Sequence, residues 1–175
     1  LLEDSPQQPL AGVYGTLLLP NDAPDPAERL AHLVDAIKRV YASTFGRRAR
    51  AFLSATAYRL EEEAMAVVLQ RVVGARHGTR FYPHISGVAR SHNYYPQPPA
   101  RPEDGIAAVA LGLGKTVAEG GACLRFAPPH PGHILDHSSV EGMLESAQRS
   151  FWALNLGASA QGHWSEDGPL ARFSL

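Results

Sequence analysis

One stretch decides the fold: Gly105-Ile-Ala-Ala-Val-Ala-Leu-Gly-Leu-Gly-Lys-Thr-Val-Ala-Glu-Gly-Gly121. The small and apolar residues 106–111 predict a buried strand, since a continuous apolar run is typical of a strand covered on both faces. Gly112 and Gly114 predict a tight turn where the backbone approaches another group. The amphipathic residues that follow predict one or two turns of helix.

The same turn contains Gly114-Lys115-Thr116, which matches the end of a Walker A phosphate loop. The complete motif needs a glycine five residues before Gly114, where this chain has Val109. We therefore do not expect a P-loop here.

The bulk composition predicts one globular domain. The chain has 175 residues, a hydrophobic content of 45% and a formal net charge of −1, so no positive excess points to nucleic acid as a partner. No apolar run approaches the roughly 20 residues that span a bilayer, and we expect no membrane partner. The single cysteine, Cys123, cannot form an internal disulfide, which favours a reducing, cytoplasmic location. We interpret it as a small buried hydrophobic residue rather than a catalytic thiol.

Local patterns predict the other elements. Asp25 and Pro26 are typical of a helix start, and Gly46 of its end. A capping box at residues 138–141 predicts another helix that runs to Phe151. Further elements are a helix over residues 47–57 and strands over residues 17–19, 64–73, 81–93 (with Gly87 as a possible bulge) and 122–126.

Two segments are candidates for a binding site. Residues 11–16 read Ala-Gly-Val-Tyr-Gly-Thr, and backbone N–H groups at Gly12 and Gly15 with the Thr16 hydroxyl suit a phosphate. The alternative is a simple turn into the next strand. Polar side chains at the end of the 64–73 strand either line a site or emerge into solvent.

A histidine group offers a third candidate. His130, His133 and His137 have spacings that suit zinc, although proline and glycine between them argue against a regular helix. A surface loop is the alternative.

Four segments, taken in order, resemble the N-terminal nucleotide-binding domain of the phosphoenolpyruvate synthase and pyruvate phosphate dikinase family. Glu3-Asp4 before Ala11-Gly12 through Thr16 resembles that family's Glu-Asp pair before Phe-Ala-Gly-x-x-x-Thr. The other three resemble the Val-x-Val-Gln-x-Met-Val strand (residues 65–73), the Ser-Gly-Val-x-Phe strand (residues 85–88) and the Gly-Leu-Gly-Glu turn (residues 112–120).

The resemblance implies an α+β, ATP-grasp-like fold with two lobes, a mixed or antiparallel sheet and flanking helices. We expect residues 1–175 to form a single piece of that domain, with the glycine-rich loop and helices in 1–63 and the sheet-containing lobe in 64–175. It implies ATP and Mg²⁺ as cofactors. The implied nucleotide-binding residues are Gly12, Gly15 and Thr16 over the phosphates and Gln70, Arg71, Val72 and Val73 at the adenine edge.

The implied activity is that of an ATP-dependent kinase, or phosphotransferase, of the phosphoenolpyruvate synthase type. ATP would phosphorylate a histidine on another domain, which would pass the phosphoryl group to pyruvate bound by a third. The family's Arg-Ser-Ser segment would precede Leu1 and its Gln-Thr-Arg strand would follow Leu175. We therefore expect a piece of a longer protein, inactive alone, and assign it no catalytic or metal-binding residue.

Lys115 stands where the family has glutamate after Gly-Leu-Gly, which is the clearest departure. Two alternatives stay open because of it: a phosphotransferase domain that serves another acceptor, and a non-catalytic regulatory or interaction module.

Overall fold

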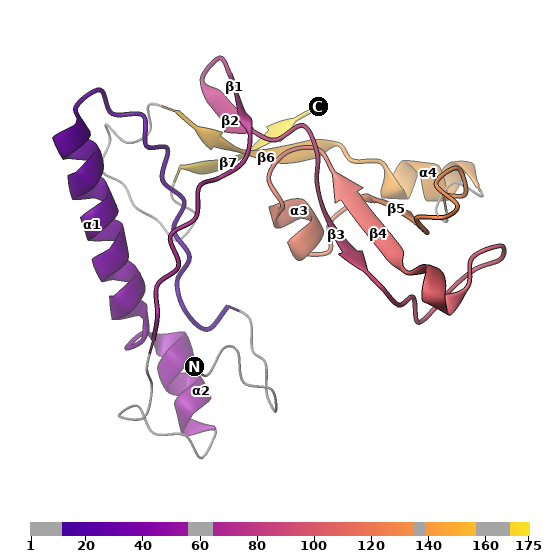
Figure 1. Ribbon diagram of the computed structural model, residues 1–175, viewed down its shortest axis with the longest axis horizontal. Coiled ribbons are helices and arrows are strands. Elements are labelled where there is room, and N and C mark those ends of the chain that lie inside the picture. The colour runs from indigo at the N-terminus through magenta and orange to yellow at the C-terminus, as the bar shows by residue number, and fades with distance from the viewer. Residues whose placement is uncertain (1–11, 56–64, 135–138, 157–168) are drawn as a thin grey trace. The chain divides into compact units, whose positions relative to one another are not determined.

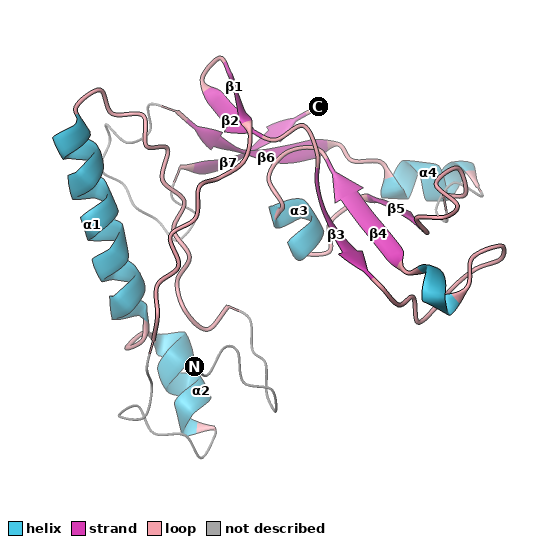
Figure 2. Cartoon of the chain, viewed as in Figure 1, coloured by secondary structure: helices cyan, strands magenta, loops and turns pink. Residues whose placement is uncertain are grey.

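A computed structural model describes residues 12–55, 65–134, 139–156 and 169–175. The chain divides into two compact units, one formed by Leu1–Val72 with Leu156–Pro169 and the other by Val73–Asn155 with Leu170–Leu175. The class is α+β, and every strand pairing is antiparallel (Figure 2).

The first unit is built on two helices, α1 (Pro26–Ser43) and α2 (Arg47–Ser54). As predicted, Asp25 caps α1: its Oδ1 accepts the Ala27 N–H at 2.9 Å. Gly46 separates the helices, and a Cβ there would lie 2.9 Å from the Ser43 carbonyl oxygen. A residue with a side chain would therefore not fit this corner.

The second unit contains two sheets. One has the order β1-β2-β6-β7, and the other β3-β4-β5. The bounds are β1 Ala75–His77, β2 Arg80–Tyr82, β3 Ser86–Arg90, β4 Ile106–Ala110, β5 Leu124–Phe126, β6 Ser150–Asn155 and β7 Leu170–Ser174. Its helices are α3 (Lys115–Ala118) and α4 (Val140–Ser146), with a 3-10 turn at Pro102–Asp104.

The core of the second unit includes buried residues of β6, of the turn after β4 and of the segment before β5. Leu154 and Cys123 are each only 2% exposed, and Phe151 is 5% exposed. The burial of Cys123 confirms its interpretation as a small hydrophobic residue. In Figure 1, α3 follows the end of β4, and the contacts place it against β3, β4 and β6.

The stretch that decides the fold forms the predicted strand, turn and short helix, but four of the five residues of β4 are half-buried rather than buried, and Gly114 has open space around its Cβ position. Residues 106–110 form β4, the central strand of its sheet, and residues 115–118 form α3. Gly112 adopts a φ of +87°, where a Cβ would lie 2.6 Å from the Trp152 carbonyl oxygen. The glycine is thus required both by its backbone conformation and by close packing.

The predicted strands at 17–19 and 64–73 are wrong for their described residues, which are in no strand. Val68 and Val73 are 84% and 81% exposed. An apolar run is buried in a sheet only when neighbouring strands pair with it. Here the next strand, β1, turns at Gly78 (φ +63°) and pairs with β2 instead.

The predicted strand over residues 81–93 is two strands in different sheets. Pro83 lies between β2 and β3, and proline has no N–H to donate to a ladder. Gly87 forms no bulge, because β3 and β4 pair residue for residue with Gly87 opposite Val109. Its lack of a side chain is explained by packing, since a Cβ would lie 2.5 Å from the Ala108 carbonyl oxygen.

The last predicted helix is shorter than expected. Ser139 caps α4 by accepting the Gly142 N–H at 3.0 Å, and the helix ends at Ser146. Ser138, the first residue of the predicted capping box, lies outside the described residues. Phe151 belongs to β6, which with β7 escaped prediction.

Candidate functional site

The glycine-rich segment lies on the C-terminal end of α1. Gly12 has a φ of +85°, and a Cβ there would meet nothing within 4 Å. Val13, only 8% exposed, anchors the segment, while Gly12, Gly15 and Thr16 are exposed. The segment is therefore a turn with an accessible backbone, as a phosphate-covering loop requires.

A serine holds this loop to the helix. The Gly15 N–H donates to Ser43 Oγ at 2.8 Å, and the same hydroxyl donates to the Val40 carbonyl at 2.6 Å. A Cβ on Gly15 would lie 3.3 Å from the Ser43 Cβ, so the fit is tight. A phosphate at Gly15 would have to take over the hydrogen bond that Ser43 now receives.

The predicted adenine edge is an extended segment without strand pairing. Gln70, Arg71 and Val73 are exposed, and Val72 is half-buried. Val72 ends the first unit and Val73 begins the second. The segment thus offers backbone groups outside any ladder, which is the feature needed to bind the edge of a base.

The Gly112 turn is closed by main-chain hydrogen bonds. The Leu113 N–H donates to the Trp152 carbonyl at 2.8 Å, and the Gly112 N–H to the Pro83 carbonyl at 3.3 Å. Both N–H groups are therefore occupied, unlike those of a phosphate loop. The turn at residues 112–116 therefore differs from a Walker A loop in its hydrogen bonding as well as in its glycine spacing.

Lys115 is held by its neighbours. Its Nζ lies 4.4 Å from the centroid of the Trp152 ring and 3.6 Å from Glu119 Oε1. A cation over an indole face is favourable. Lys115, which stands where the family has glutamate, thus has a structural role through its contacts with Trp152 and Glu119.

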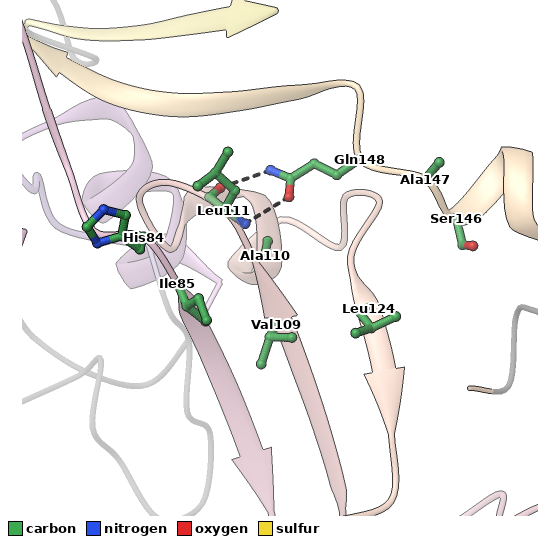
Figure 3. A pocket seen from close by; sticks show the side chains of 9 residues that line it. All are labelled: His84, Ile85, Val109, Ala110, Leu111, Leu124, Ser146, Ala147 and Gln148. Atoms are coloured by element: carbon green, nitrogen blue, oxygen red, sulfur yellow. Dashed lines mark hydrogen bonds between the residues drawn. The ribbon is translucent and has the colours of Figure 1, made fainter. Parts of the chain in front are cut away.

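A pocket of about 330 Å³ opens where β4 ends (Figure 3). Ile85, Val109 and Leu124 give it an apolar wall, and His84 lies at its side. Gln148 crosses one side: its Oε1 accepts the Leu111 N–H at 2.8 Å, and its Nε2 donates to the carbonyls of Leu111 (2.9 Å) and Ser150 (3.0 Å). No sequence motif marks this glutamine, because its bonds to Leu111 join it to main-chain groups 37 positions away.

The structure tests the zinc hypothesis only for His130 and His133, which it describes. His130 Nε2 lies 3.7 Å from Asp104 Oδ2, and His137 lies outside the described residues. Within residues 12–55, 65–134, 139–156 and 169–175, no three His, Cys, Asp or Glu side chains are grouped so as to hold a metal ion.

As for membranes, the described helices include none with both the length and the apolar character needed to cross a bilayer.

Comparison with models of protein families identifies the family. The family model described as the pyruvate phosphate dikinase AMP/ATP-binding domain matches residues 1–131, about three quarters of the chain. No curated protein and no solved structure matches significantly. The matched range contains the glycine-rich segment, the 70–73 segment and the Gly112 turn. The chain therefore belongs to the family of the AMP/ATP-binding domain of pyruvate phosphate dikinase.

Proposed function

We propose that this chain is the ATP-binding part of a phosphoenolpyruvate synthase-like phosphotransferase, with an ATP-grasp arrangement. The observation that carries the proposal is the family match over residues 1–131, which includes every proposed contact. In such an enzyme, ATP phosphorylates a histidine on another domain, which then passes the group to pyruvate. The single buried cysteine favours a cytoplasmic location.

Gly12, Gly15 and Thr16 are the proposed phosphate contacts. The three residues are exposed, and the Gly15 N–H would exchange Ser43 Oγ for a phosphate oxygen. Catalysis of phosphoryl transfer relies mainly on positioning and charge neutralisation. Gln70, Arg71, Val72 and Val73 are the proposed adenine contacts, through main-chain groups and apolar side chains.

Mg²⁺ would accompany the nucleotide. The described residues hold no group of three His, Cys, Asp or Glu side chains that could bind a metal ion by themselves. Magnesium commonly binds through substrate phosphates and water with one or two carboxylates.

Calorimetric titration with ATP and Mg²⁺ tests the proposal. Gly12→Ala should weaken ATP binding, because alanine disfavours a φ of +85° and the loop would change conformation. Gly78→Ala is the matched control: Gly78 also has a positive φ (+63°) and open space around its Cβ position, but it lies in the β1–β2 turn. Equal ATP affinity of the wild type and Gly12→Ala, or no binding by the wild type, would contradict the proposal.

One observation favours a second candidate, a non-catalytic regulatory or interaction module. Lys115 is engaged by Trp152 and Glu119, so it serves the local structure in place of the family's acidic residue. ATP binding without ATP-dependent histidine phosphorylation in the intact protein would support this candidate. Phosphorylation would exclude it.

A further inference from the structure

A second pocket of the Val73–Asn155 unit, about 520 Å³ in volume, has a different character from the one beside Leu111. It is lined by α3, the end of α4 and the β6–β7 pair, and most of its lining residues lie beyond residue 131, where the family match ends. Its size is within the range of small-molecule sites. Its polar side chains include Thr116, Glu145, Arg149, Ser150 and Arg172.

Arg172 is positioned by β6. It lies directly opposite Trp152 in the β6–β7 ladder, and its Nε donates to Ser150 Oγ at 2.6 Å. Among the described residues, its two terminal nitrogens have no hydrogen bond or ion pair. The guanidinium is thus held at one nitrogen while the others remain available to an anion.

Arg149 adds a second guanidinium to the same pocket. Its Nη2 reaches the Leu144 carbonyl at 3.3 Å, a long distance for such a hydrogen bond. The Leu175 N–H donates to the Arg149 carbonyl at 3.0 Å, which fixes its backbone beside β7. The backbones of both arginines are therefore fixed by hydrogen bonds within or beside the β6–β7 pair, and both side chains line the same pocket.

The charge balance favours an anion. Glu119 lies 3.6 Å from Lys115 and is thereby compensated, which leaves two arginines against Glu145. Trp152 supplies a half-buried aromatic surface, with Lys115 over its ring. An anion with an apolar or planar body would match both features.

We propose that this pocket binds a small organic oxyanion. Its phosphate or carboxylate group contacts Arg149 and Arg172, and its apolar part packs on Trp152. Arginine is suited to both groups because its planar fork pairs with two oxygens at once. The proposal does not depend on nucleotide binding by the first unit.

Fluorescence of Trp152 tests it in the Trp164→Phe background, where Trp152 is the remaining tryptophan of the two in the chain. The probes are phenyl phosphate, phenylacetate and neutral phenol. We expect saturable quenching by one or both anions, and which of them binds identifies the acidic group. Arg172→Gln should weaken binding roughly tenfold or more.

Arg90→Gln is the matched control, since Arg90 is an exposed arginine of the same unit, in β3, outside the pocket. Glu145→Gln should tighten binding, because it removes the opposing carboxylate, and it keeps the test open if Arg172→Gln does not fold. Four results would overturn the proposal: no saturable change with either anion, equal quenching by phenol, equal losses in Arg90→Gln and Arg172→Gln, or no gain in Glu145→Gln.

Discussion

Gln148 pairs with Leu111 as a strand residue would, through one accepted and one donated hydrogen bond of 2.8 and 2.9 Å. A third bond, to the Ser150 carbonyl, uses the remaining amide hydrogen. A side chain thus completes the main-chain bonding just beyond β4 and connects it to the start of β6.

Replacing Gln148 with alanine should lower the free energy of unfolding by about 1–3 kcal/mol, because it leaves the Leu111 N–H and carbonyl without their partner. Urea unfolding followed by circular dichroism measures the change. Gln97→Ala, at an exposed loop position, is the control and should change little. A loss as small as that of the control would show that water replaces the bonds.

Gly112→Ala should cost about 3 kcal/mol or more, since it combines a positive φ with a Cβ that would lie 2.6 Å from the Trp152 carbonyl oxygen. Gly114→Ala should be almost neutral, because Gly114 has a helical φ of −60° and open space around its Cβ position. Thermal unfolding of both variants gives the comparison. Similar melting temperatures would contradict the close approach at Gly112.

Ser43→Ala should release the glycine-rich loop from α1, because the Ser43 hydroxyl accepts the Gly15 N–H. We expect a loss of about 1 kcal/mol in stability and weaker ATP binding, since the loop becomes less ordered. Ser54→Ala is the control, because it removes a similar hydroxyl that donates to the Ala51 carbonyl three residues earlier in α2. Tighter ATP binding by Ser43→Ala would instead mean that Ser43 competes with phosphate for Gly15.

Lys115→Glu should destabilise the protein by about 1 kcal/mol, because it removes the cation from the Trp152 ring and places two carboxylates one helical turn apart. The other lysine of the chain, Lys38, lies exposed on α1, and Lys38→Glu is the control. Chemical denaturation distinguishes the two. If Lys115→Glu were as stable as Lys38→Glu, the contact with Trp152 would contribute little.

The sequence predicted those features whose conformation depends on residues nearby in the chain. The Asp25 cap, the corner at Gly46 and the strand and turn at residues 106–114 follow from nearby chemistry. β6 and β7 were not predicted, because a pairing between strands that are separated in sequence leaves little trace in either strand alone. The run at 65–73 misled for the same reason, since its composition suits a strand but its pairing depends on distant partners.

The candidate site was predictable only as far as the family pattern reaches. That pattern identified the glycine-rich segment as a loop, and the positive φ of Gly12 agrees with it. Neither Ser43 under Gly15 nor Gln148 beside Leu111 was foreseen, because each bonds to main-chain groups far away in sequence. Side chains with distant backbone partners carry no local motif.

The largely exposed run at residues 67–73 also has a bearing on solubility. It reads Val-Val-Leu-Gln-Arg-Val-Val, with no proline and with Arg71 as its single charge. Such segments are the ones through which proteins associate edge to edge into aggregates. Arg71 is therefore a gatekeeper, whose charge opposes the stacking of one copy of this segment on another.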